Sequence, residues 1–113
     1  MRQFACAISL FLVGGCAHYY DNDEQLMRTI ERSVRLPRDA SPMGAYRRHY
    51  AWENDSQNFV LAVFVRGGSP DRLWLSRDEL PIVMDGGCSV VTFKYDTKVS
   101  RAVAMQCNGG NDR

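Results

Sequence analysis

The chain has 113 residues, of which 45% are hydrophobic and 24% are charged, and its formal net charge is +1. This length accommodates one folded domain at most, with the composition of a globular protein. Arg2 is the one charged residue among the first 16, so the 14 basic residues fall to 13 beyond them and balance the 13 acidic ones. A neutral chain lacks the positive charge with which sequence-independent binders neutralise phosphates, so we expect no nucleic-acid partner.

The first 15 residues have the character of an export leader. Met1, Arg2 and Gln3 form a short positively charged region, and an apolar run follows from residue 4 to residue 13. That run is too short for a membrane-spanning helix, which needs about 20 apolar residues, and no later segment is long and apolar enough to span. We therefore predict that residues 1–15 are a signal peptide and set them aside from the fold.

The end of this leader, Val13-Gly14-Gly15-Cys16, resembles the lipobox of bacterial lipoproteins, in which two small residues precede an invariant cysteine. The resemblance covers residues 1–17, and Val13 stands where leucine is more usual. It implies cleavage before Cys16, a diacylglyceryl thioether on the Cys16 sulfur, an acylated amino terminus and so a lipid anchor in a membrane. Ala17 occupies the position of an inner-membrane retention signal, typically aspartate, so the pattern implies the outer membrane, with the domain facing the periplasm.

Ordinary secretory cleavage is the alternative, because Gly15-Cys16-Ala17 is also a small-x-small site. It would remove Cys16 and leave a soluble periplasmic or secreted protein. Under either reading Cys6 leaves with the leader, so Cys88 and Cys107 remain in the folded part. An even number of cysteines in an oxidising compartment predicts one disulfide, Cys88–Cys107.

Residues 16–22 form a short polar tether, and a helix is predicted from Asp23 to Leu36. The Asp and Asn residues at its start are good N-caps, and Pro37 disfavours a helical conformation at Leu36. Apolar residues recur at four-residue spacing and form one stripe: Leu26, Ile30 and Val34. Such a stripe is typical of a helix that packs one face on a core.

After Pro37 the period changes to two residues, which is typical of strands. Strands are expected at about 46–53, 59–65, 72–76, 88–95 and 101–107, separated by turns rich in Gly, Asn, Asp and Ser. The run from residue 59 to residue 65 is almost continuously apolar, as in a central strand covered on both faces. Ser76 and Glu79 have capping-box spacing, which favours one helical turn between the third and fourth strands.

The last two strands form the clearest hairpin, with two possible registers. A four-residue loop, Thr97–Ser100, would put Val90 opposite Cys107, whereas a two-residue loop would put Cys88 opposite Cys107. Both registers leave the two sulfurs on one face of the hairpin, because side chains alternate with period two.

We predict an α+β fold with one N-terminal helix packed on an antiparallel sheet of four or five strands. Short turns make a meander the simplest topology. Residues 23–108 would form this single domain, held by one disulfide, and residues 109–113 a disordered tail.

Residues that could carry chemistry are sparse. His49 is the one histidine beyond the tether, and it lies on the polar face of its strand without a nearby nucleophile motif. Two cysteines and one distant histidine do not make a zinc site. We therefore predict no catalytic, cofactor-binding or metal-binding residues.

The remaining candidate site is a group of strand side chains: Tyr46, Arg48, Tyr50, Trp52 and Trp74. If exposed, they would suit a protein or polysaccharide partner, because Tyr, Trp and Arg dominate binding hot spots. The alternative is that they cover the core against the helix. Two functions follow: a small noncatalytic accessory or interaction lipoprotein of the cell envelope, or a periplasmic binding or inhibitory module that uses this face.

Overall fold

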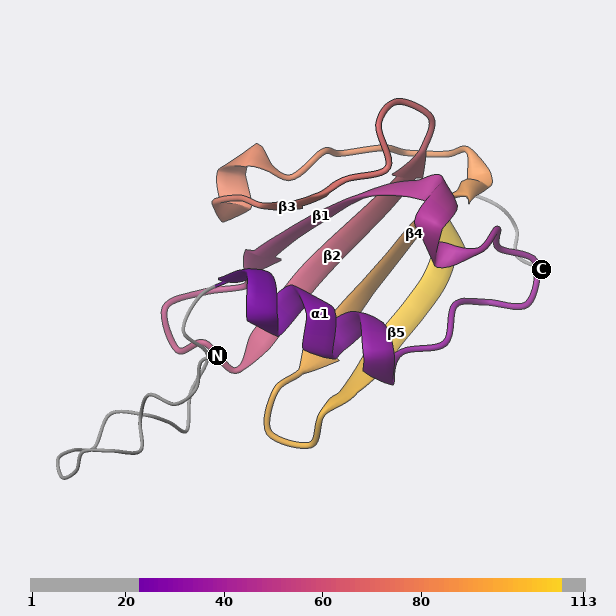
Figure 1. The fold of residues 1–113 in the computed structure, drawn as a ribbon. Coiled ribbons are helices and arrows are strands. Elements are labelled where there is room, and N and C mark those ends of the chain that lie inside the picture. Colours follow the sequence, from indigo (N-terminus) through magenta and orange to yellow (C-terminus); the bar gives the residue numbers. More distant parts are fainter. Residues whose placement is uncertain (1–22, 109–113) are drawn as a thin grey trace, which may run out of the picture.

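The computed structural model describes residues 23–108 and shows one helix packed on a five-stranded sheet (Figure 1). This architecture confirms the α+β class. The predicted signal peptide, Cys16 and the tether at 16–22 lie outside the described residues, as does the predicted tail at 109–113. Within residues 23–108, no helix is long and apolar enough to cross a membrane.

The elements follow one another along the chain as α1 Asp23–Ser33, η1 Met43–Ala45, β1 Tyr46–Trp52, β2 Phe59–Arg66, β3 Arg72–Trp74, η2 Arg77–Glu79, β4 Gly87–Asp96 and β5 Arg101–Asn108. The strands lie in the order β3-β1-β2-β4-β5. The almost continuously apolar β2 is therefore the central strand, as its sequence predicted.

Helix α1 buries the predicted stripe against the sheet through Leu26, Met27 and Ile30. It ends at Ser33, three residues before the predicted end at Leu36. One further helical hydrogen bond joins the Val34 N–H to the Ile30 carbonyl, at 3.1 Å. The chain then continues without helical structure, and Val34 and Leu36 still pack against the core.

The prediction of a purely antiparallel meander was wrong, because the sheet is mixed. β3 does not pair with β2, which precedes it, but lies parallel to β1 on the far edge. The second edge of β2 is occupied by β4 over seven residue pairs, a far longer ladder than three-residue β3 could form. The Arg48 N–H binds the Asp71 carbonyl at 2.8 Å and the Leu75 N–H binds the Tyr50 carbonyl at 2.7 Å, which fixes β3 beside β1.

The core lies between α1 and one face of the sheet. On β2 this face carries Val60, Ala62 and Phe64, and the Phe64 ring packs edge-on against Phe93 with centroids 5.3 Å apart. β1 alternates as predicted, with Tyr46, Arg48 and Tyr50 buried on the helix side.

The β4–β5 hairpin has the predicted four-residue loop, since Asp96 pairs with Arg101. Further along, the predicted pairing of Val90 with Cys107 is off by one residue, and Val91 lies opposite Cys107 instead. The shift arises between Val103 and Gln106, where β5 carries one extra residue and Ala104 has a φ of 54°. This β-bulge breaks the two-residue alternation. As a result, Ala102 and Met105 both contact the core although they are three residues apart.

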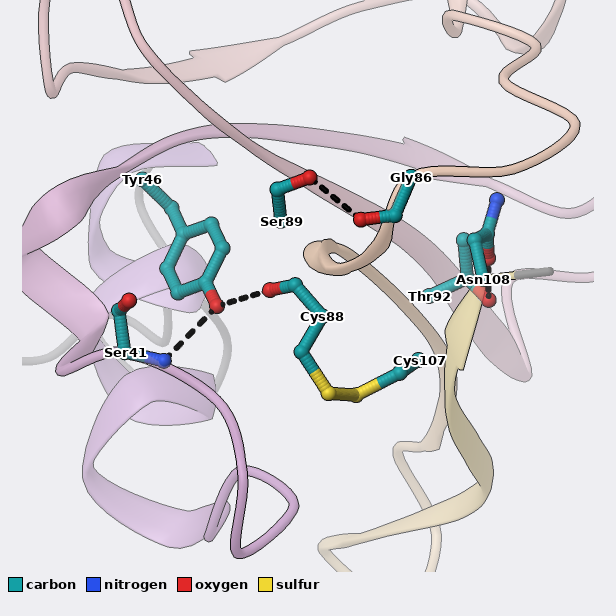
Figure 2. Close-up of a disulfide and its surroundings, with 8 residues drawn as sticks. All are labelled: Ser41, Tyr46, Gly86, Cys88, Ser89, Thr92, Cys107 and Asn108. Carbon is teal, nitrogen blue, oxygen red and sulfur yellow. Dashed lines mark hydrogen bonds between the residues drawn. A yellow bond between two sulfur atoms is a disulfide. The ribbon is translucent and has the colours of Figure 1, made fainter. Parts of the chain in front are cut away.

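The Cys88–Cys107 disulfide is present, as predicted, and joins the first part of β4 to the end of β5 (Figure 2). The pairing of β4 with β5 also shifts in register between Gly87 and Val91. In this stretch the Cα atoms of the two cysteines are 4.6 Å apart. Beside the bridge, the Tyr46 hydroxyl donates to the Cys88 carbonyl at 2.6 Å and accepts from the Ser41 N–H at 3.0 Å. The bridge thus belongs to a network that connects β1, β4 and the loop after α1.

Replacing both cysteines by alanine is expected to lower the free energy of unfolding by about 3 kcal/mol, the chain-entropy value for closing a loop of roughly 20 residues. Urea unfolding of the double variant and of the parent chain measures the difference. Adding a reductant should lower the parent's midpoint to that of the variant and leave the variant's midpoint unchanged. Equal midpoints for the oxidised parent and the variant would contradict a stabilising role.

Candidate functional site

The five predicted partner-binding residues do come together, but most of them lie beneath helix α1. Tyr46 and Tyr50 have no exposed surface, and Arg48 is 8% exposed. Tyr50 stacks on Trp74 with ring centroids 6.4 Å apart, and Trp52 meets Trp74 edge-on at 5.6 Å. This arrangement is the one expected if the set covers the core. Trp52 and Trp74, both partly buried, retain the surface that a partner could contact.

A buried ionic cluster is built around the same residues, and its centre is the carboxylate of Glu31 on α1. Arg72 of β3 donates to both oxygens of this carboxylate, through Nε at 3.2 Å and Nη2 at 2.9 Å. The Tyr50 hydroxyl of β1 donates to the same carboxylate at 2.8 Å. Planar, two-pronged recognition of a carboxylate by Arg is stronger and more directional than a contact through Lys. The cluster therefore fixes the helix to two strands at once.

Arg48 completes the cluster from below the helix. Its Nη1 donates to the Met43 carbonyl at 3.1 Å and its Nη2 to the Pro70 carbonyl at 3.2 Å. Its Nε lies 3.4 Å from Glu31 Oε2, which meets the distance of an ion pair, yet this nitrogen forms no hydrogen bond. We regard the contact as charge attraction without good hydrogen-bond alignment. Both side chains are about 10% exposed, so water screens that attraction weakly.

The cluster shifts the pKa values of Tyr50, Arg72 and Glu24. Burial, reinforced by the Glu31 charge, raises the pKa of Tyr50 far above its ordinary value of 10.0, so Tyr50 remains a neutral donor. The hydrogen bonds to Glu31 raise the pKa of Arg72. At the exposed margin, the bond from Arg28 is the main reason that the pKa of Glu24 lies below 4.5, and Arg72 contributes as well. Tyr50 donates to a carboxylate that Arg72 already holds with both of its oxygens, so this geometry favours a structural clamp.

His49, the one histidine among the described residues, does not belong to the ionic cluster. His49 lies on the sheet face away from α1, where its Nδ1 is 2.8 Å from the Val63 carbonyl. No three His, Cys, Asp or Glu side chains in the described part of the chain are grouped so that they could hold a metal ion.

A groove of about 580 Å³, which was not predicted from the sequence, lies on the face of the sheet opposite α1. Residues 75–86, here called the crossover, lead from β3 to β4 (Figure 1) and form one wall. Apolar side chains from the sheet and the crossover line much of it: Leu61, Val63, Leu80, Pro81 and Ile82. The signal that could have revealed it is the apolar run at 80–84, which the predicted strands left without a role.

Comparisons with known proteins give no relative for this chain: no family model, no curated protein and no solved structure matches it.

Glu31→Gln is expected to lower the free energy of unfolding by about 3 kcal/mol, because removing one partner of a buried pair leaves the charge of Arg48 uncompensated and leaves Arg72 paired with Glu24 alone. We take the lower end of the usual range because the Arg72 side chain is 27% exposed. Arg28→Gln is the control, since its pair with Glu24 is exposed and should contribute less than about 1 kcal/mol. Urea unfolding of both variants measures the contrast, and equal losses would contradict a buried clamp.

A pH titration tests how much the ion pairs of Glu24, at the exposed end of the cluster, stabilise the fold. The lowered pKa of Glu24 means that its ion pairs stabilise the fold above pH 4.5, and that this contribution is lost as the pH falls through the folded-state pKa. The stability of the parent chain should therefore fall more steeply below about pH 4.5 than that of Glu24→Gln. Carboxyl NMR should show the Glu24 pKa rising in Arg28→Gln. A Glu24 pKa at or above 4.5 in the parent would refute the assignment.

Proposed function

We propose that this chain is a small noncatalytic lipoprotein of the cell envelope, anchored through Cys16 and acting as an accessory or interaction module. The sequence supports an anchor through the lipobox-like residues 13–16, which are followed directly by a short tether. Stable anchoring needs more than one acyl chain, and the lipobox pattern implies a diacylglyceryl group together with an acylated amino terminus.

The observation that carries the proposal is the Cys88–Cys107 disulfide. Both cysteines of the described domain are in this bridge, and none of them is free. Structural disulfides persist in oxidising compartments such as the bacterial periplasm and are rare in the cytosol. The bridge therefore supports export.

The alternative, a periplasmic binding or inhibitory module with an aromatic and arginine face, has less support. Such a face would need exposed aromatic side chains with an arginine rim. Tyr46, Tyr50 and Arg48 are buried instead, and the Arg72 guanidinium is occupied by Glu31 and Glu24. The accessory-lipoprotein reading does not depend on that face.

Expression of the full-length gene in a Gram-negative host, followed by intact-mass measurement, tests the anchor. The expected product begins at Cys16 and carries three acyl chains. Reduction should add the mass of two hydrogens, since Cys88 and Cys107 form one bridge. A Cys16→Ser variant is the matched control and should carry no lipid.

A lipid-free product that begins at residue 18 would refute the anchored form and leave a secreted domain. A lipidated product without a mass gain on reduction would leave the anchor in place but remove the disulfide as support for it.

A further inference from the structure

Two of the three large apolar side chains that are exposed in residues 23–108 lie on the crossover. Ile82 is 87% exposed and Met84 is 80% exposed. Ile82 also lines the groove, together with Leu61 and Val63 of β2. An apolar projection and an apolar hollow therefore lie next to each other, and exposed apolar surface of this kind commonly marks a protein contact.

The crossover is also acidic. Asp78, Glu79 and Asp85 are exposed, and Arg77 is the one cation of this segment. None of the three carboxylates forms an ion pair with another residue of the described part of the chain. Glu79 accepts hydrogen bonds from the Ser76 N–H and hydroxyl, which lower the pKa of Glu79 below 4.5. Three carboxylates against one guanidinium leave an excess of negative charge along the crossover near neutral pH.

The cations that line the groove do not offset this excess. Arg77, already counted with the crossover, donates through Nη1 to the Glu53 carbonyl at 3.3 Å. Lys94 Nζ lies 2.9 Å from the Glu53 carboxylate and 5.1 Å from the centre of the Phe59 ring. Lys94 and Glu53 together are therefore neutral, and the carboxylates of the crossover lack a cationic partner.

We propose that the crossover face, meaning residues 75–86 and the groove beside them, binds a segment of another protein that is both basic and apolar. An apolar side chain of this segment occupies the groove beside Ile82, and its Lys or Arg side chains lie against Asp78 and Asp85. Opposite charges of this kind steer two partners together and fix how they meet. The inference names the partner of the interaction module proposed above and rests on that role, but it does not rest on the lipid anchor.

The same features argue against other occupants. A small molecule in the groove would leave the exposed Met84 side chain in water, whereas a protein segment along the crossover would cover it. An anionic lipid surface attracts basic segments and would repel this acidic one. A second copy related by a twofold axis would set the acidic crossover against itself, and like charges across an interface are unfavourable.

Photo-crosslinking to a defined peptide tests the proposal. The product of the full-length gene carries a photoreactive amino acid at position 84 and is held in vesicles of zwitterionic phosphatidylcholine. The probe is a short synthetic peptide of alternating Lys and Leu, and the expected product is its adduct, identified by intact mass. Position 56 is the matched control, because Ser56 is exposed beside an acidic residue, Asp55, and does not line the groove. A peptide of alternating Glu and Leu should give no adduct at position 84.

Paired substitutions test the charge argument at a peptide concentration that gives half of the maximal adduct. Asp78→Asn combined with Asp85→Asn should lower the yield at position 84 by about fivefold, as expected for the loss of exposed ion pairs. Asp39→Asn combined with Asp55→Asn is the control, because it removes two exposed carboxylates elsewhere on the surface and should leave the yield unchanged. Arg77→Gln should raise the yield, because it removes the one cation of the crossover.

A second pair of substitutions tests the apolar contact. Ile82→Ser should lower the yield by about tenfold, as expected for loss of a central interface residue. Val99→Ser, at a position that is 58% exposed in the β4–β5 loop, should leave the yield unchanged. Intact mass before and after reduction confirms in each variant that the Cys88–Cys107 bridge has formed.

Absence of a peptide adduct at position 84 would overturn the proposal, as would equal yields at positions 84 and 56 or with the two peptides. Equal losses in the two double aspartate variants would also overturn it. Adducts of position 84 with a second copy or with lipid, in place of the peptide, would assign the face to those occupants instead. None of these results bears on whether Cys16 carries lipid, so the anchor and the partner surface fail separately.

Discussion

The Glu31 carboxylate is the contact on which the arrangement of this domain depends most. Burying a carboxylate is costly unless it is paired and hydrogen-bonded, and here donors arrive from two strands, through Arg72 of β3 and through Arg48 and Tyr50 of β1. Ion pairs of this kind often stabilise less than an apolar replacement would, and their best-supported role is to select one arrangement among several. In this fold the arrangement selected is the position of α1 over the β1–β3 edge.

The position of α1 also bears on β3 and on the course of residues 75–86, which follow it. β3 has three residues, and backbone bonds hold it parallel to β1, while the Arg72 side chain ties it to Glu31 of α1. Because β3 lies at one edge and β4 beyond the central strand, residues 75–86 must pass across β1 and β2 to connect them. The groove is bounded by this passage. A clamp on the helix side of the sheet thereby creates a surface on the opposite side.

Features set by local alternation could be predicted from the sequence, and features set by distant contacts could not. The α1 stripe, the buried face of β1 and the Ser76–Glu79 capping box each need only a few neighbouring residues, and all three are present. The position of β3 rests on backbone bonds to β1 and on the contact of Arg72 with Glu31, which is 41 residues away. The bulge at Ala104 is a backbone shift that side-chain alternation does not record, so the register near Cys107 was off by one although the bridge itself was right.

The candidate binding face could not be settled from composition for a related reason. Tyr, Trp and Arg are enriched both in binding hot spots and at the margins of cores, and the difference is whether a helix covers them. Here α1 covers Tyr46 and Tyr50, and Glu31 neutralises the arginines that would have formed a rim. The uncovered apolar residues, Ile82 and Met84, lie in a segment without strand or helix periodicity. Burial of the aromatic set and exposure of the crossover are therefore two results of placing one helix on one face of the sheet.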